Sequence, residues 1–150
     1  MRIRVGITIK APPAAVWRTI EPIDRHVDWM ADAQSIHFTT RFTRGVGAAF
    51  DCLTKVGPFR LRDHMVVTEW DPPRAMGIEH RGVVTGRGRF TVRRTLRNQT
   101  RFRWTEQLHF PWWLGGPVGA LAAWPVLWIV WRRNLRRLKS LVESESQEHA

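Results

Sequence analysis

Acidic side chains, cysteine and tyrosine are all scarce in this chain of 150 residues. Asp and Glu number 13 against 24 Lys and Arg, which gives a formal net charge of +11, so we expect a surface that attracts anions. The single cysteine, Cys52, excludes an internal disulfide and a cysteine-based metal cluster, and it fits a reducing cytoplasm. Tyrosine is absent, and the aromatic side chains are nine tryptophans and seven phenylalanines.

Signatures of several common chemistries are also missing. The glycine-rich segment 82–88 lacks the Lys-Ser or Lys-Thr ending of a phosphate-binding loop and lies between expected strands. His64 and His80 have no partners at zinc-ligand spacing, so we expect neither a bound metal nor a cofactor. Residues 1–10 alternate instead of forming an apolar run, so we expect no secretory signal and a cytoplasmic protein, with peripheral membrane association left open.

Length and composition favour one ordinary globular domain. A chain of 150 residues that is 43% hydrophobic can bury a core and enclose a cavity. We place the domain at residues 1–142 and expect residues 143–150 (ESESQEHA) to form a polar, frayed tail.

The elements follow from periodicity and turn residues. Residues 2–10 alternate as a half-buried strand, and residues 13–20 and 23–30 read as two short helices. Short connections between the strands that follow indicate an antiparallel meander. These six strands are expected at residues 34–42, 48–56, 59–70, 75–81, 87–96 and 100–110.

A long helix is expected from about residue 117 to Val142. One face carries an apolar stripe and the other a basic one. The apolar stripe comprises Trp124, Trp128, Trp131, Leu135, Leu138 and Val142, and the basic side comprises Arg132, Arg133, Arg136, Arg137 and Lys139.

Four segments carry a family resemblance: residues 9–17 (IKAPPAAVW), Trp29, residues 45–47 (GVG) and residues 67–73 (VTEWDPP). With the order of elements, they make nearly the whole chain similar to the helix-grip fold. This is the START-like (SRPBCC) superfamily, which includes the plant Bet v 1 allergens and the bacterial polyketide cyclase/dehydrase and lipid-transport proteins. The resemblance implies an α+β fold in which a seven-stranded curved antiparallel sheet grips the C-terminal helix. It also implies a site for a hydrophobic ligand between sheet and helix, and catalysis in only some members.

Strand faces give candidate polar groups inside such a pocket. Alternation in residues 100–110 turns Glu106 toward the aromatic interior. We infer a three-residue turn at residues 97–99, which places Arg94 opposite Phe102, Val92 opposite Trp104 and Phe90 opposite Glu106. The candidate internal polar groups are Glu106, His80, Arg94 and Asp63.

Three interpretations of these groups stay open. They either neutralise one another structurally, or anchor a hydroxyl or carbonyl of a ligand, or use Glu106 or His80 as acid/base in a cyclase/dehydrase-like reaction. The expected ligand is a small hydrophobic molecule such as a lipid or polyketide. The residues expected to contact it are Met65, Val67, Ile78, His80, Phe90, Val92, Arg94, Trp104, Glu106, Leu108, Trp124 and Trp128.

Two further surfaces bear on partners. The same register places Arg93 opposite Arg103 on a basic outer face, for which nucleic acid is the weaker partner because no exposed aromatic platform accompanies it. Residues 112–131 carry no charge and precede an arginine cluster, as in a membrane span. The interruptions at residues 115–117 and Pro125 favour a helix packed on the sheet instead, with the tryptophans near 112 available to a bilayer interface.

Overall fold

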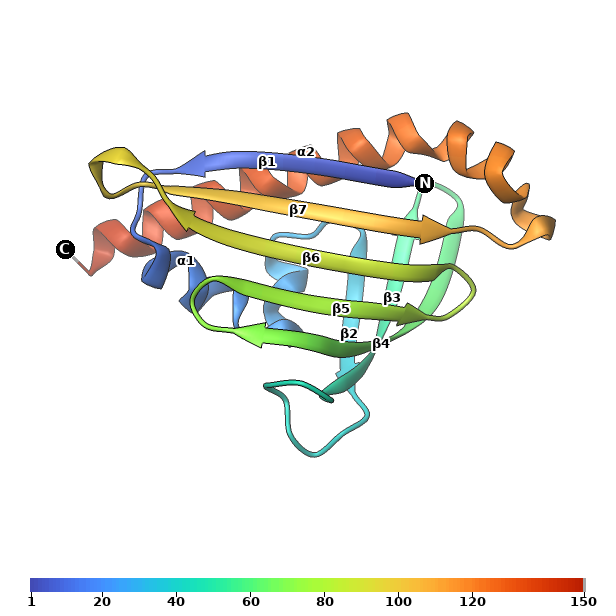
Figure 1. Cartoon of the computed structure of the whole chain (residues 1–150), viewed down its shortest axis with the longest axis horizontal. Helices are drawn as coiled ribbons and strands as arrows, with labels where there is room; N and C mark the ends of the chain where they lie inside the picture. Colours follow the sequence, from blue (N-terminus) through green and yellow to red (C-terminus); the bar gives the residue numbers. More distant parts are fainter. Residues whose placement is uncertain (150) are drawn as a thin grey trace.

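The computed structural model describes residues 1–149 and shows a seven-stranded antiparallel sheet with a long C-terminal helix running along it (Figure 1). The sheet order is β1-β7-β6-β5-β4-β3-β2, so each strand after β1 lies beside its neighbour in sequence and β1 closes the far edge against β7. The strands are β1 Arg2–Ile9, β2 Ala33–Phe38, β3 Ala49–Val56, β4 Phe59–Asp71, β5 Ala75–Arg81, β6 Thr85–Arg94 and β7 Thr100–His109. The predicted α+β helix-grip architecture is confirmed.

Helices cover one face of this sheet. The short helix α1 (Pro13–Ile20) and the 3-10 helix η1 (Ile23–Asp28) connect β1 to β2, and α2 (Gly116–Glu148) passes behind β1 and β7 in Figure 1. Proline in the first turn of α1 costs no hydrogen bond, which is why Pro13 can begin it. The curved sheet and α2 therefore face each other across the interior.

The core consists of the alternate strand residues that face α1, η1 and the second half of α2. Trp29, which follows η1, is fully buried against the rings of Phe90, Phe102 and Trp104. In α2 the buried positions Trp131, Leu135, Leu138 and Val142 form the predicted stripe over its second half. Trp124 and Trp128, predicted for the same stripe, lie at its flank and are partly exposed, stacked on each other.

The register between β6 and β7 differs from the prediction by two residues. Arg94 pairs with Thr100, so the connection spans residues 95–99 instead of three residues. It is longer because Arg97 and Asn98 adopt left-handed conformations (φ 63° and 56°) in a short 3-10 turn, η2 (Leu96–Asn98). The predicted connection of three residues and the observed one of five both have an odd length, so the inner and outer faces of the two strands were predicted correctly.

The observed register changes which residues of β6 and β7 lie opposite each other. Phe90 pairs with Trp104 and Val92 with Phe102, while Glu106 lies opposite Gly88. Arg94 is exposed at the end of β6, so its predicted place in the interior is wrong. On the outer face Arg93 pairs with Arg101, not with Arg103.

The C-terminal end of α2 also departs from expectation, because the helix continues past Val142 to Glu148. Glu143 accepts the backbone N–H of Lys10 at 2.8 Å, and Glu145 accepts the hydroxyl of Thr19 at 3.0 Å. These contacts tie the segment that was predicted to fray onto the rest of the fold. Ala150, the last residue of that predicted tail, lies outside the described residues.

The first half of α2 was the candidate membrane span. Pro125 lies inside it, and the helix leaves Val118, Leu121 and Ile129 exposed. Within residues 1–149, no helix has both the length and the hydropathy that crossing a membrane requires.

Candidate functional site

A cavity of about 540 Å³ lies between the inner face of the sheet and α2. Its wall is mainly apolar and comes from β2 to β7, from η1 and from the first half of α2. The helix contributes small or aliphatic side chains there, which leaves room beneath it: Ala122, Ala123, Val126 and Leu127, followed by Trp131. This volume is within the range of sites that hold small organic ligands.

Most of the residues predicted to contact a ligand lie on this wall. They are Met65, Ile78, His80, Phe90, Trp104, Glu106 and Leu108. Val67 and Val92 are buried in the core elsewhere, and Arg94 is exposed because of the register shift. Trp124 and Trp128 lie outside the wall because the helix turns Ala123 and Leu127 toward the cavity instead.

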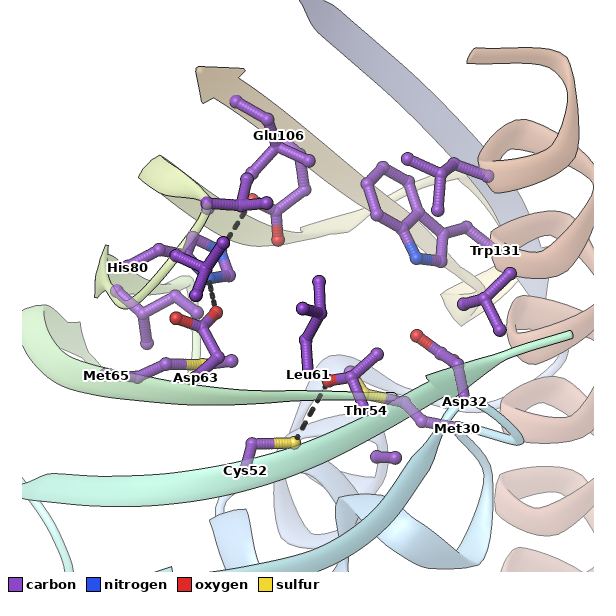
Figure 2. A pocket seen from close by; sticks show the side chains of 18 of the residues that line it. Met30, Asp32, Cys52, Thr54, Leu61, Asp63, Met65, His80, Glu106 and Trp131 are labelled. Carbon is purple, nitrogen blue, oxygen red and sulfur yellow. Dashed lines mark hydrogen bonds and ion pairs between the residues drawn. The ribbon is translucent and has the colours of Figure 1, made fainter. Parts of the chain in front are cut away.

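Three polar side chains meet at one side of the cavity (Figure 2). The imidazole of His80 on β5 lies between two carboxylates, with Nδ1 2.5 Å from Asp63 Oδ2 on β4 and Nε2 2.9 Å from Glu106 Oε2 on β7. The indole N–H of Trp104 donates to the other oxygen of Glu106, Oε1, at 2.9 Å. Sequence alternation had placed all three polar groups on the inner face, and their mutual neutralisation was one of the interpretations left open.

Glycines on β6 make this contact possible, because β6 lies between the strands that carry His80 and Glu106. His80 pairs across the sheet with Gly86, and Glu106 pairs with Gly88. A Cβ at Gly88 would lie 2.5 Å from Glu106 Oε1, and one at Gly82 would collide with Asp63 Oδ1. Two of the three glycines in segment 82–88, Gly82 and Gly88, therefore leave space for the carboxylates, while Gly86 lies against the backbone of Gln107 and Leu108.

The protonation state of His80 follows from its partners. Burial by itself opposes the charge and lowers the pKa, but the hydrogen bonds to Asp63 and Glu106 and their negative charges outweigh it and raise the pKa of His80 to about 10. Each ring nitrogen therefore donates to a carboxylate at neutral pH. His80 is therefore an imidazolium held between the carboxyl groups of Asp63 and Glu106, and it is not available as a general base there.

On the opposite wall lies Asp32, between η1 and β2, which is paired with Asn134 of α2. Asn134 is fully buried, donates to Asp32 Oδ1 at 2.6 Å and accepts the backbone N–H of Ala31 at 3.0 Å. Burial raises the pKa of Asp32, against the opposing hydrogen bonds from Asn134 and Trp131. Sequence-based prediction missed both residues, although an asparagine beside the buried stripe of a helix is itself a signal for a buried hydrogen bond.

Two further titratable groups on the wall, His26 and Cys52, are uncharged at neutral pH. Burial lowers the pKa of His26 to about 4, and this neutral ring donates from Nε2 to the carbonyl of Ile20 at 2.6 Å. Burial raises the pKa of the Cys52 thiol to about 11, so it is a small apolar residue and not a nucleophile. Among residues 1–149 no set of His, Cys, Asp and Glu side chains is arranged to hold a metal ion.

A curved antiparallel sheet that closes over a long C-terminal helix, with a cavity between them, defines a helix-grip protein. The chain belongs to the family described as polyketide cyclase / dehydrase and lipid transport, whose model matches residues 1–143. No curated protein sequence matches the chain.

Solved structures share this fold at low sequence identity. TTHA0849 from Thermus thermophilus is 16% identical with a TM-score of 0.80, over 97% of this chain and 99% of that chain. The ZhuI aromatase/cyclase from a Streptomyces species is 16% identical with a TM-score of 0.71, over 98% of this chain and 93% of that chain. DR_A0006 from Deinococcus radiodurans is 13% identical with a TM-score of 0.71, over 97% and 98% of the two chains.

Proposed function

We propose that this protein binds a small hydrophobic molecule, such as a lipid or a polyketide, in the cavity between the sheet and α2. The observation that carries the proposal is an apolar cavity of about 540 Å³ with a few polar groups gathered on its walls. Such a combination holds the body of a ligand by burial and orients it by hydrogen bonds. The family, described by cyclisation, dehydration and lipid transport, supports it.

Filling the cavity tests this proposal. Ile78 lies on the wall from β5, so Ile78→Trp should occupy the space of the ligand. We expect native mass spectrometry of freshly purified protein to show a co-purifying hydrophobic molecule in the wild type, and the variant to lose it. Fluorescence of Trp104 and Trp131, which line the cavity, should report the same loss when an apolar probe is titrated.

Arg87→Trp is the matched control, because Arg87 is exposed on the outer face of β6 and the same ring added there leaves the cavity unchanged. This variant should bind as the wild type does. An Ile78→Trp protein that is folded and binds undiminished would refute the proposal.

Catalysis in the same cavity is a variant of this function, supported by the family description. His80 is protonated at neutral pH, so it would act only as an acid, and Glu106 is the remaining candidate for proton transfer. In that case Glu106→Gln should abolish turnover of a polyketide substrate while ligand binding persists, and an undiminished rate would exclude this role.

The exposed surface of α2 favours a second function, contact with an anionic membrane. Trp112 and Trp113 are 87% and 58% exposed, and Val118 and Leu121 continue this apolar surface along the helix. From Arg132 onward the exposed face becomes basic, and no acidic residue occurs between Glu106 and Glu143. Aromatic rings beside arginines suit the boundary between acyl chains and anionic headgroups.

Vesicle sedimentation tests this contact. We expect binding to vesicles that contain phosphatidylserine, little binding to phosphatidylcholine alone, and a steep loss with added salt. Trp112→Ser with Trp113→Ser should reduce binding about tenfold or more, since burying each indole in the interface contributes on the order of 1–2 kcal/mol. Leu96→Ser, an equally exposed apolar position in the β6–β7 connection, should change nothing. Equal binding to both vesicle types would contradict the proposal.

A further inference from the structure

The polar atoms that face the cavity are mostly hydrogen-bond acceptors. Figure 2 shows the carboxyl groups of Glu106 and Asp32 on opposite sides of the same hollow. His26 on the wall is neutral and adds no positive charge, because burial lowers its pKa to about 4 and its Nε2 donates to a backbone carbonyl. Thr54 contributes a hydroxyl that both donates and accepts.

The cationic residues of the wall do not offer their charge to a ligand in the cavity. Both N–H groups of His80 already donate to Asp63 and Glu106, so its positive charge is paired within the wall. Arg62 and Arg89 belong to strands of the wall, but both side chains are exposed, and Arg89 forms a bidentate pair with Glu69. Both arginines alternate along their strands with residues of the inner face, so their side chains point outward, and within residues 1–149 no Lys or Arg side chain of the inner face borders the cavity.

From this arrangement we infer that the cavity selects an apolar molecule that carries a hydrogen-bond donor, such as a hydroxyl, over one that ends in a carboxylate or phosphate. The inference rests on the proposed function and specifies its ligand class. Each carboxyl oxygen can accept more than one hydrogen bond, so a hydroxyl can donate to Glu106 or Asp32 and replace the hydrogen bond that it loses on leaving water. An anionic group would face carboxyl oxygens at both walls and would lose its hydration without a cation to replace it.

Three probes with the same apolar chain test this selectivity: decan-1-ol, decyl methyl ether and decanoate. The alcohol donates and accepts, the ether only accepts, and decanoate is an anion at pH 7.5. We expect the alcohol to bind at least about tenfold more tightly than decanoate, with the ether weaker than the alcohol, in titrations followed by tryptophan fluorescence. Decanoate that binds as tightly as the alcohol would overturn the inference and leave the proposed function intact. If none of the three probes binds, the proposed function itself fails.

Dehydration alone disfavours decanoate in any apolar cavity, so variants must isolate the part played by the acceptors. Asp32→Asn keeps the oxygen that accepts from Asn134 and replaces the other acceptor with an N–H donor. Glu106→Gln replaces the carboxyl group on the opposite wall with an amide, which keeps one acceptor oxygen and adds an N–H donor. Each variant should narrow the ratio between alcohol and decanoate affinities several-fold.

Two variants are used because one of them could fail to fold. Glu106→Gln removes a charge partner of His80, whereas Asp32→Asn leaves the His80 cluster untouched, so circular dichroism and the second variant keep the test decisive. Wild-type ratios in both folded variants would overturn the inference, because the acceptors would then play no part in selectivity. Arg87→Trp serves again as the control with an unchanged ratio.

Discussion

At the scale of single residues, the site depends on two glycines of β6, which have no side chain to fill the space between β5 and β7. His80 and Glu106 lie on strands separated by β6, and they meet only because β6 carries Gly86 and Gly88 where they cross it. A Cβ at Gly88 would occupy the space of the Glu106 carboxylate, and a Cβ at Gly86 would collide with the backbone of Gln107. These glycines therefore act through close approach to β7, not through turn formation alone.

Substitution of Gly88 tests this packing. A Cβ would lie 2.5 Å from Glu106 Oε1, so Gly88→Ala should lower the free energy of unfolding by about 1–3 kcal/mol. In a Glu106→Ala background the same substitution should cost less than half as much, since the atom it meets is gone. Urea unfolding of the four proteins in this cycle measures the difference, and equal costs in the two backgrounds would contradict the argument.

At the scale of elements, α2 consists of two unlike halves. The second half buries Trp131, Leu135 and Leu138 against the sheet, whereas the first half places alanines over the cavity and leaves large apolar residues exposed. The first half of α2 therefore covers the cavity but buries few large apolar side chains. The C-terminal end of α2 is held by the carboxylates of Glu143 and Glu145, which accept from Lys10, just after β1, and from Thr19 in α1.

Truncation tests the contribution of that end. Removing residues 143–150 should lower the free energy of unfolding by about 1–2 kcal/mol, because the Lys10 N–H and the Thr19 hydroxyl lose charged acceptors that are only partly screened. Removing residues 147–150 keeps both carboxylates and should change stability by less than about 0.5 kcal/mol. Two truncations of equal stability would show that the segment contributes nothing.

At the scale of the whole molecule, two histidines make stability depend on pH in opposite directions. The pKa of His80 is raised to about 10, so its contribution is complete below pH 6.5 and is lost as the pH rises through about 10. The pKa of His26 is lowered to about 4, so its contribution is complete above pH 6.5 and is lost as the pH falls through about 4. Together they predict maximum stability near pH 6.5.

Denaturant unfolding between pH 4.5 and pH 9 should show both limbs, each approaching a slope of about 1.4 kcal/mol per pH unit. His80→Gln should flatten the alkaline limb and leave the acid limb, and His26→Gln should do the reverse. The range stops at pH 9 because the Cys52 thiol, whose pKa burial raises to about 11, adds its own loss of stability above that pH. Variants that retain both limbs would refute the assignment.

Local chemistry in the sequence determined most of the fold. Alternating residues such as Ile3, Val5 and Ile9 specify a strand wherever they occur, and short connections allow only antiparallel neighbours, so the seven strands and the helices could be predicted. The same alternation placed Asp63, His80 and Glu106 on the inner face, because side-chain direction in a strand is set by parity alone.

Tertiary structure decided what parity cannot. Parity is unchanged by a shift of two residues, so the longer turn at Arg97 and Asn98 moved Arg94 out of the interior without breaking any sequence pattern. The contact between His80 and Glu106 across β6, and the pairing of Asn134 with Asp32, join residues far apart in the chain. Such contacts depend on the curvature of the sheet and the position of α2 over it, which no local pattern of residues encodes.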